Sequence, residues 1–292
     1  MSAQQQQQQA VTDKLKYMVK NLVKLPTLPS VVSAISSLMA NPNVSVADIN
    51  KVISKDAALS AKVLKLVNSP FYGFPRKVTT ISHAIIVLGF NTVRDLVLSV
   101  SVFDTFKGES KTLDKDAFWK HSIGVGVATR ILAKRAGYTK LEEVFLAGLL
   151  HDIGKIVLDQ FANQLYIKIL AMCKEKNLLL YDVERAALGV THSEVGKWLA
   201  DSWNLPFDLS EAIEFHHSPP RARNAKEVVM LVHCADIFCR SIDIGNGGDN
   251  KIPIIDETAW QYLRLTEETM PDVLKAIGEE FDAASAFLKA TK

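Results

Sequence analysis

The sequence predicts an all-helical fold. Nearly every segment repeats its apolar residues with the period of a helix, and no segment sustains the apolar–polar alternation of a half-buried strand. Prolines, turn-rich loops and polar stretches divide these segments into pieces of ordinary helix length. The 292 residues are 48% hydrophobic, which is enough to build one large domain or two compact ones.

The first half of the chain is predicted to be a series of helices that follows a polar N-terminal segment. Residues 1–12 include the run Gln4 to Gln9 and are expected to be a disordered Gln-rich tail, because the run is low in complexity. A helical N-terminal subdomain is predicted over residues 13–106. Its expected helices run over 13–24, from the Pro26 and Pro29 punctuation through Met39, and over 46–54, 56–68, 80–88 and 92–106.

An aromatic loop, Ser69–Pro75, interrupts this series. Its aromatic residues either form a partner surface or fold onto the core, and the second alternative is favoured. The polar stretch 107–116 is a candidate boundary before a second helical set over 116–241, so residues 107–243 are taken as a second subdomain. Residues 244–253 carry three glycines and are predicted to be a flexible loop. The remainder to residue 292 is amphipathic, with Thr266 as the expected N-cap.

Charge and cysteine usage exclude several classes of partner. The 34 basic residues nearly balance the 32 acidic ones, so there is no electrostatic case for nucleic acid as the main partner. The N-terminus lacks the features of a signal peptide, and no apolar run approaches the roughly 20 residues of a membrane helix. The three cysteines form no C-x-x-C pair and are predicted to be reduced thiols. A cytoplasmic protein with no membrane partner is expected.

Seven polar residues lie where a helical protein would normally place Leu, Val or Ile. They are five histidines and two aspartates: His121, His151, Asp152, His192, His216, His217 and Asp236. Burying an unpaired imidazole or carboxylate is costly, so seven of them suggest one shared compensating partner. A metal ion is the cheapest such partner.

The local pattern around each residue supports this interpretation. His121 falls on one helical face with Phe118 and Val125, which is a core position. Thr191 and Glu194 form a capping-box pattern that puts His192 in the first turn of its helix. The same helical spacing places His151, His216 and Asp236 on apolar faces, and Asp236 has no basic residue near it before Arg240.

Four short motifs in this chain resemble the signature of the HDOD domain, a helical output domain of bacterial signalling proteins related to the HD phosphohydrolases. The motifs are Leu25-Pro-Thr-Leu-Pro29, Asn68-Ser-Pro-Phe-Tyr-Gly73, Ile81-Ser-His-Ala-Ile85 and Leu88-Gly89. The resemblance spans roughly residues 22–240. It implies a helical N-terminal subdomain packed on an HD-type helical bundle, a regulatory role and, for most members, no demonstrated activity.

The resemblance to the HD superfamily also implies a set of ligands. One metal would be held by residues that match His121, His151, Asp152 and Asp236. In the HD-GYP phosphodiesterases a second metal is held through positions that match His192, His216 and His217, with Asp152 bridging the two ions. Mixed imidazole and carboxylate ligands favour Fe or Mn, with Zn and Ni as alternatives.

Two metals would activate a shared water toward a phosphorus centre, with Asp152 in the catalytic role and Lys155 neutralising a phosphate oxygen. Lys155 has a simpler alternative as a solvated charge or a partner of the helix dipole. His217 could instead cap its helix or face solvent. His83 and His233 are interpreted as ordinary structural histidines, as most histidines on apolar helix faces are.

Two departures separate this chain from the HD-GYP enzymes. Ala117 stands where that family has an acidic residue, and Ser218-Pro-Pro-Arg221 replaces its Gly-Tyr-Pro segment. Cyclic-di-GMP phosphodiesterase activity is therefore not expected. Two hypotheses remain: a regulatory module that binds a signalling protein or a small phosphorylated ligand, and a metal-dependent phosphohydrolase. An enzyme requires an open coordination position that faces a cleft.

Overall fold

The structure is a computed structural model that describes residues 13, 17, 25–108, 110 and 112–290. All the regular elements among these residues are helices, which confirms the predicted all-α fold. The Gln-rich tail and nearly all of the helix predicted over 13–24 lie outside the described residues. The first set of helices is α2 Ser30–Met39, α3 Val46–Ile53, α4 Ala57–Val67, α5 Ile81–Leu88 and α6 Phe90–Thr105.

The helices of this first set begin where the sequence supplies N-caps. The side chains of Ser45, Asp56 and Thr80 each accept a backbone N–H from the first turn of the helix that follows. Gly89 ends α5 and precedes α6 with a φ of 84°, a conformation that favours glycine. Local signals therefore account for the boundaries of α3, α4 and α5 to within one or two residues.

The second set of helices builds the bundle. Asp114 caps its longest helix through the N–H of Ala117, and Gly137 ends that helix in the left-handed conformation. The members of the set are α7 Lys115–Ala136, α8 Leu141–Leu150, α9 Ile153–Phe161, α10 Asn163–Lys176, α11 Leu180–Leu188, α12 His192–Ser202, α13 Phe207–Phe215, the short 3₁₀ helix η1 Pro219–Arg221 and α14 Lys226–Ser241.

The last helices are α15 Glu257–Leu263, α16 Met270–Ala283 and α17 Ser285–Ala290. The predicted N-cap at Thr266 is wrong: α16 starts four residues later, with Thr269 before it. The backbone N–H of Thr266 donates instead to the Thr269 hydroxyl at 3.0 Å, which closes a turn ahead of the helix. A turn residue and an N-cap carry the same local signal, so the sequence did not distinguish them.

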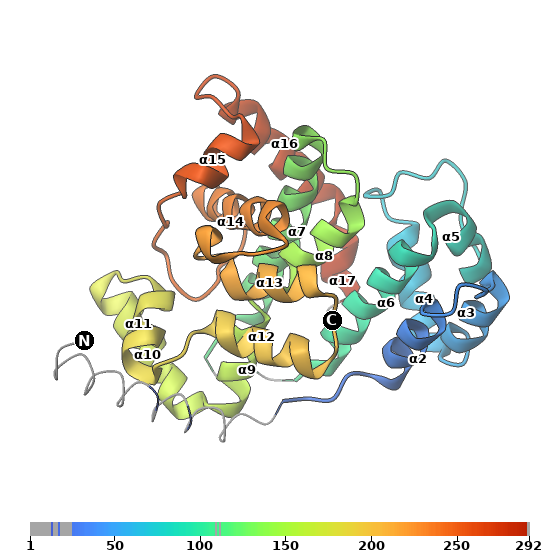
Figure 1. Ribbon diagram of the computed structural model, residues 1–292, viewed down its shortest axis with the longest axis horizontal. Helices are drawn as coiled ribbons and strands as arrows, with labels where there is room; N and C mark the ends of the chain where they lie inside the picture. Colours follow the sequence, from blue (N-terminus) through green and yellow to red (C-terminus); the bar gives the residue numbers. More distant parts are fainter. Residues whose placement is uncertain (1–12, 14–16, 18–24, 109, 111, 291–292) are drawn as a thin grey trace.

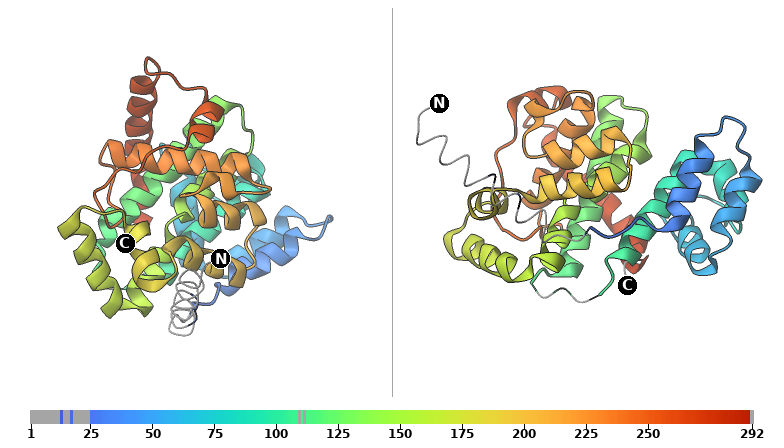
Figure 2. Two further views of the ribbon diagram at one scale, coloured as in Figure 1. Left: turned by 60° about the vertical axis from the view of Figure 1, so that its left-hand side comes forward. Right: turned by 60° about the horizontal axis from the view of Figure 1, so that its bottom comes forward.

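Figures 1 and 2 show α2–α5 standing to one side of the bundle. Helix α6 contacts α2, α4 and α5 on one side and α8 on the other, so it belongs to the interface between the two parts. Helix α7 is the central element of the bundle and contacts α8, α14 and α16. The C-terminal helix α17 packs against both α7 and α4. One continuous apolar core therefore extends through both parts.

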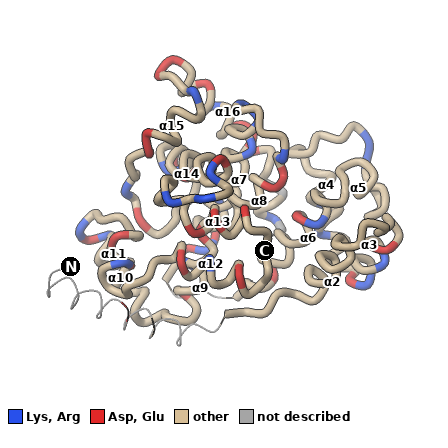
Figure 3. The backbone as a smooth tube through the Cα atoms, viewed as in Figure 1, with Lys and Arg blue, Asp and Glu red and all other residues tan. Residues whose placement is uncertain are grey.

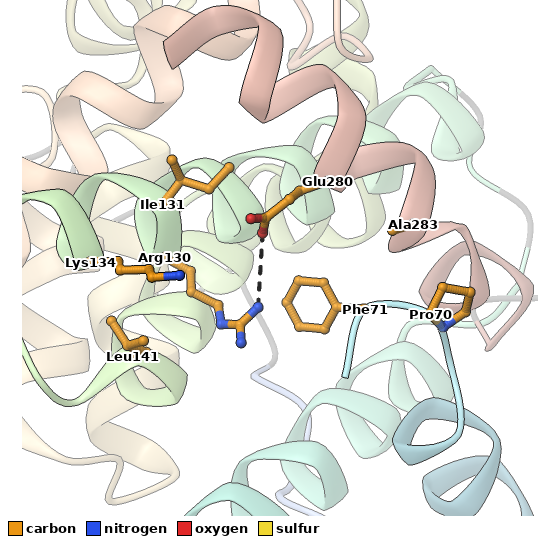
Figure 4. A pocket seen from close by; sticks show the side chains of 8 residues that line it. All are labelled: Pro70, Phe71, Arg130, Ile131, Lys134, Leu141, Glu280 and Ala283. Atoms are coloured by element: carbon orange, nitrogen blue, oxygen red, sulfur yellow. Dashed lines mark ion pairs between the residues drawn. The ribbon is translucent and has the colours of Figure 1, made fainter. Parts of the chain in front are cut away.

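The aromatic loop Ser69–Pro75 is folded onto this core, as the second of its two interpretations expected. The Phe71 ring packs against Phe145 and Phe287 at centroid distances of 5.3 and 5.6 Å. The Arg130 guanidinium of α7 lies over the Phe71 ring, 4.5 Å from its centroid, and pairs with Glu280 of α16 (Figure 4). Arg130 thus joins the loop, the bundle and the C-terminal helices.

The surface has neither a basic face nor a membrane-spanning element among the described residues. Lys and Arg are interspersed with Asp and Glu along the backbone in the view of Figure 3. None of the described helices combines the length and apolarity required to cross a bilayer.

His83 is exposed on α5, so the interpretation of this residue as a core histidine is wrong. Cys173, Cys234 and Cys239 are buried free thiols.

Candidate metal centre

All seven candidate ligands reach one buried region of the bundle, most of them from helix ends. His151 is the C-cap of α8, Asp152 is the N-cap of α9, and His192 is the first residue of α12. His216 is the C-cap of α13, followed directly by His217. His121 and Asp236 come from within α7 and α14. Every one of these side chains is buried except His217, which is half-buried.

Four of the seven form an outer group, defined as Asp152, His192, His216 and His217. Their ligand atoms all lie within 4.8 Å of one another. Asp152 Oδ1 is 3.2 Å from His192 Nε2 and 3.6 Å from His216 Nε2. The Nε2 atoms of His192 and His217 are 3.0 Å apart. Neighbouring ligands on an ion with bonds of about 2.1 Å lie roughly 3.0–3.4 Å apart, so the spacing fits a metal.

An inner group, defined as His121, His151 and Asp152, meets the same mutual distance of 4.8 Å. Asp152 uses its other oxygen here, with Oδ2 at 3.2 Å from His151 Nε2. Asp236, the expected fourth ligand, lies outside this mutually close group, although its Oδ1 is 3.0 Å from His121 Nε2. The same Oδ1 accepts a hydrogen bond from Arg240 Nε at 2.9 Å. A protein cation therefore already binds this carboxylate.

Hydrogen bonds at Nδ1 fix the orientation of the imidazoles. The Nδ1 atoms of His151 and His216 lie 2.7 and 2.9 Å from the carbonyl oxygens of Gly148 and Ile213. His192 Nδ1 lies 2.6 Å from Glu184 Oε2. A proton on Nδ1 satisfies each of these acceptors and leaves Nε2 as a lone pair directed at the cluster, which is the arrangement that second-shell partners impose on metal-binding histidines.

Three atoms of the cluster have no hydrogen-bond partner although they are buried. They are His151 Nε2, Asp152 Oδ1 and His216 Nε2. Buried polar atoms are nearly always satisfied, so a converging set of unsatisfied lone pairs requires an explanation. A cation in the outer group would satisfy Asp152 Oδ1 and His216 Nε2, whereas His151 Nε2 belongs to the inner group. The residues present therefore fit a metal ion.

The electrostatics prepare His216, His217 and Asp152 as ligands. Burial lowers the pKa of His216 to about 4 and, together with the neighbouring imidazoles, lowers the pKa of His217 well below its usual value. Burial opposes ionisation of Asp152, but His151 and Lys155 outweigh it and hold the pKa of that carboxyl well below its usual range. Neutral imidazoles and an ionised carboxylate are the forms that bind metals. Burial opposes protonation of His192, but Glu184 outweighs it and raises the pKa of that imidazole, so His192 must lose a proton when a metal binds.

Lys155 is buried, with 0% of its surface exposed, so the interpretation of this residue as a solvated charge is wrong. Its ammonium donates to Asp152 Oδ2 at 2.6 Å, on the side of the inner group. Four carboxylates surround the cluster against two cations, Lys155 and Arg240. The carboxylates are those of Asp152, Asp236, Glu184 and Asp249. With neutral imidazoles two negative charges remain in excess, the charge that one divalent ion balances.

Glu184 is the functional candidate that sequence reasoning missed. Its carboxylate is fully buried and accepts the backbone N–H of His192 at 2.7 Å, the ring Nδ1–H at 2.6 Å and the Tyr166 hydroxyl at 3.0 Å. Glu184 shares a helical face with Leu180, Val183 and Leu188, which are also buried. A carboxylate at a core position of this kind is the signal that identified the other seven residues, and it was present here too.

Glu184→Gln is expected to weaken metal binding about 10–100-fold, because an amide holds the His192 ring less firmly than a carboxylate. The folded protein is expected to remain, since the amide oxygen still accepts a hydrogen bond. Calorimetric titration of the metal-free protein with Mn²⁺ measures the change. Glu194→Gln is the matched control, because Glu194 closes the capping box of the same helix without touching the ring. Equal affinities in the two variants would contradict the role of Glu184.

His233 has a structural role, as predicted. Its Nδ1 lies 2.7 Å from the His216 carbonyl oxygen, and its Nε2 accepts the N–H of Asp256 at 2.9 Å. Both ring nitrogens are therefore occupied in one neutral tautomer. The ring ties the segment before α15 to the backbone of a candidate ligand.

The two groups differ in their access to solvent. A cleft of about 290 Å³ reaches His192 and His217 of the outer group, and Tyr181 and Ile254 lie among its walls. Within the predicted flexible loop 244–253, Asp249 and Pro253 line the cleft, whereas Gly245 and Gly247 lie against the inner group. A Cβ placed on Gly247 would lie 2.9 Å from Lys155 Nζ and 3.2 Å from Asp152 Oδ2. Of the two groups, the outer one therefore lines this cleft.

The fold and this site define a class: all-helical proteins built around a His-Asp pair within a buried His/Asp cluster that is compatible with a metal site. The family model of the HDOD domain matches residues 25–219, which is most of the chain. The chain therefore belongs to the HDOD domain family, and the resemblance seen in its sequence motifs is confirmed.

Known proteins similar to this chain share its fold over nearly the whole length. The structure of an HDOD domain protein from Geobacter sulfurreducens is 25% identical with a TM-score of 0.81, and the match covers 94% of this chain and 97% of that one. A structure from Shewanella amazonensis SB2B, named a "putative phosphohydrolase", is 26% identical with a TM-score of 0.74 and covers the same shares of the two chains.

A curated relative from Treponema pallidum (strain Nichols), named an uncharacterized protein, is 28% identical over 262 residues. This match covers 89% of the chain and 50% of the relative. The chain thus spans about half the length of the curated relative that it matches.

Proposed function

We propose that this chain is a regulatory HDOD module whose outer group binds one divalent metal ion. A small phosphorylated ligand in the adjoining cleft would be sensed by binding to this ion. The observation that carries the proposal is the unequal state of the two groups. Asp152 Oδ1, which faces the outer group, has no partner, whereas Oδ2, which faces the inner group, is bound by Lys155.

The carboxylates at and beside the inner group are already paired with cationic side chains of the protein. Lys155 and Arg240 bind the two carboxylates on which a second metal would depend. Displacing them would bury two unpaired cations, which is unfavourable. One ion in the outer group requires no such displacement, and it balances the excess negative charge. This arrangement supports binding at one metal more than the two-metal hydrolysis of phosphoesters.

The metal we propose is Fe or Mn, with Zn or Ni as alternatives, because three imidazoles and one carboxylate suit first-row transition metals. His192, His216, His217 and Asp152 would hold the ion, and Glu184 would keep His192 in place. When bound, the ion supplies a Lewis-acidic position that a phosphate oxygen of the ligand can occupy. A signalling protein is the partner that we propose for the output of the module.

A metal-dependent phosphohydrolase is the second candidate, and one observation favours it. The two oxygens of Asp152 point to two separate groups of imidazoles, which is the arrangement of a carboxylate that bridges two ions. In that case Lys155 would have to leave Asp152 before the second ion binds. The name of the similar protein from Shewanella amazonensis is consistent with this candidate.

Metal stoichiometry combined with a hydrolysis screen separates the two candidates. The regulatory proposal predicts one equivalent of tightly bound metal and no turnover of phosphomonoester or phosphodiester substrates at any metal concentration. Two equivalents, with turnover that Lys155→Met changes, would favour the hydrolase. A purified protein that folds normally and binds no divalent metal would overturn both.

A further inference from the structure

The cleft that leads to the outer group has an apolar lip. Tyr181, Leu179 and Pro253 line it together with Ile254, whose side chain is 94% exposed. The floor is polar and is formed by His192, His217 and Arg240. In a site with polar groups at its base and apolar walls, the polar groups orient the polar end of a ligand and the walls bury its apolar part.

Ile254 is the feature least explained by the fold. It is the most exposed large apolar side chain among the described residues. Single exposed aliphatic residues are common, but this one stands at the edge of a cleft beside a half-buried aromatic ring. Tyr181 lines the same cleft, with its ring centroid 4.7 Å from that of His217. Tyr181 and Ile254 thus both offer apolar surface to the same cleft.

The floor is suited to an anion. Arg240 lines the cleft, where Asp236 and Asp249 already pair with its guanidinium. An ion in the outer group would cancel the remaining negative charge around the cluster and would offer a coordination position to an anionic oxygen. Asp249, which also lines the cleft, is occupied by Arg240 and by the backbone N–H groups of Leu180 and Lys251. Asp182 is exposed at the rim, where solvent screens its charge. The anionic end of a ligand is therefore favoured at the floor.

We infer that the cleft selects a small phosphate or phosphonate that carries a flat apolar group, with that group held between Tyr181 and Ile254 and the anionic head at the floor. The volume of about 290 Å³ suits a single ring with its head group and is too small for a folded peptide segment. The inference rests on the proposed function, because it assumes that the outer group holds a metal ion.

Phenylphosphonate and methylphosphonate test this inference, since they share a head group and neither can be hydrolysed as an ester. Binding to the Mn²⁺-loaded protein is measured by calorimetry. Phenylphosphonate is expected to bind about tenfold more tightly, because the ring removes its own surface and that of Ile254 from water. In Ile254→Ser this advantage is expected to fall to about threefold or less, with methylphosphonate unaffected.

Ile252→Ser is the matched control, because Ile252 is 50% exposed two residues away and does not line the cleft. It is expected to keep the full tenfold advantage. Equal binding of the two phosphonates to metal-loaded protein would overturn the inference and leave the proposed metal site intact. Loss of self-association in Ile254→Ser, with unchanged phosphonate binding, would identify the lip as a contact between copies and also overturn it. Failure to load any metal would instead be a failure of the proposed function.

Discussion

Asp152→Ala is expected to abolish metal binding and to destabilise the folded protein by about 3–5 kcal/mol, the usual cost of removing one partner of a buried ion pair. Asp152 supplies one oxygen to the outer group and binds Lys155 with the other. The variant therefore loses a ligand and leaves a fully buried ammonium without a counterion. Metal titration and urea unfolding of the metal-free protein measure the two effects separately.

The double variant Asp152→Ala/Lys155→Met provides the control. Methionine fills the space of the lysine stem without a charge, so most of the lost stability should return while metal binding stays absent. A single variant that still binds metal with unchanged affinity would contradict the assignment of Asp152 as a ligand. A double variant no more stable than the single one would contradict the role given to the Lys155 pair.

Gly154→Ala is expected to destabilise the protein by at least about 3 kcal/mol, at the upper end of the cost of overpacking a core. Gly154 lies in α9 where this helix crosses α12. A Cβ there would lie 1.9 Å from the backbone oxygen of His192 and 2.7 Å from the backbone nitrogen of Gly196. Neither backbone atom can move away alone, so the two helices must separate. Because His192 begins α12, metal affinity should fall as well.

Gly278→Ala is the matched control for this variant. Gly278 lies inside α16, and apart from its chain neighbours and the backbone of its own helix no atom lies within 4 Å of the position that its Cβ would take. Alanine is favoured over glycine inside a helix, so this variant should gain about 0.5–1 kcal/mol. Urea unfolding of both variants measures the difference. A Gly154→Ala protein as stable as the parent would show that α9 and α12 are not in backbone contact.

The fold could be predicted because its signals are local. Helical periodicity predicted α7, α8, α13 and α14, and the capping box of Thr191 and Glu194 placed the start of α12. The same periodicity located six residues that reach the inner and outer groups, because a polar residue on an apolar helix face must be buried with its neighbours. The spacing along the chain did not reveal how two groups share Asp152.

What the sequence did not reveal depends on long side chains and on backbone contacts between distant segments. Lys155 was open to interpretation as a solvated charge, although its ammonium is buried on Asp152. In the sequence Asp236 has no basic residue near it before Arg240, yet a single helical turn lets Arg240 bind that carboxylate. The loop 244–253 was predicted to be flexible from its glycines. In the structure Gly245 and Gly247 allow the backbone to lie against His121 and Lys155, where a side chain would not fit.

Anomalous diffraction from crystals grown with Mn²⁺ tests the central claim most directly. The claim predicts one strong peak, about 2.0–2.2 Å from the Nε2 atoms of His192, His216 and His217 and from Asp152 Oδ1. Lys155 should remain on Asp152 Oδ2, and the inner group should show no second peak. Two peaks of similar height on either side of Asp152, or no peak at the outer group in a well-folded protein, would contradict it.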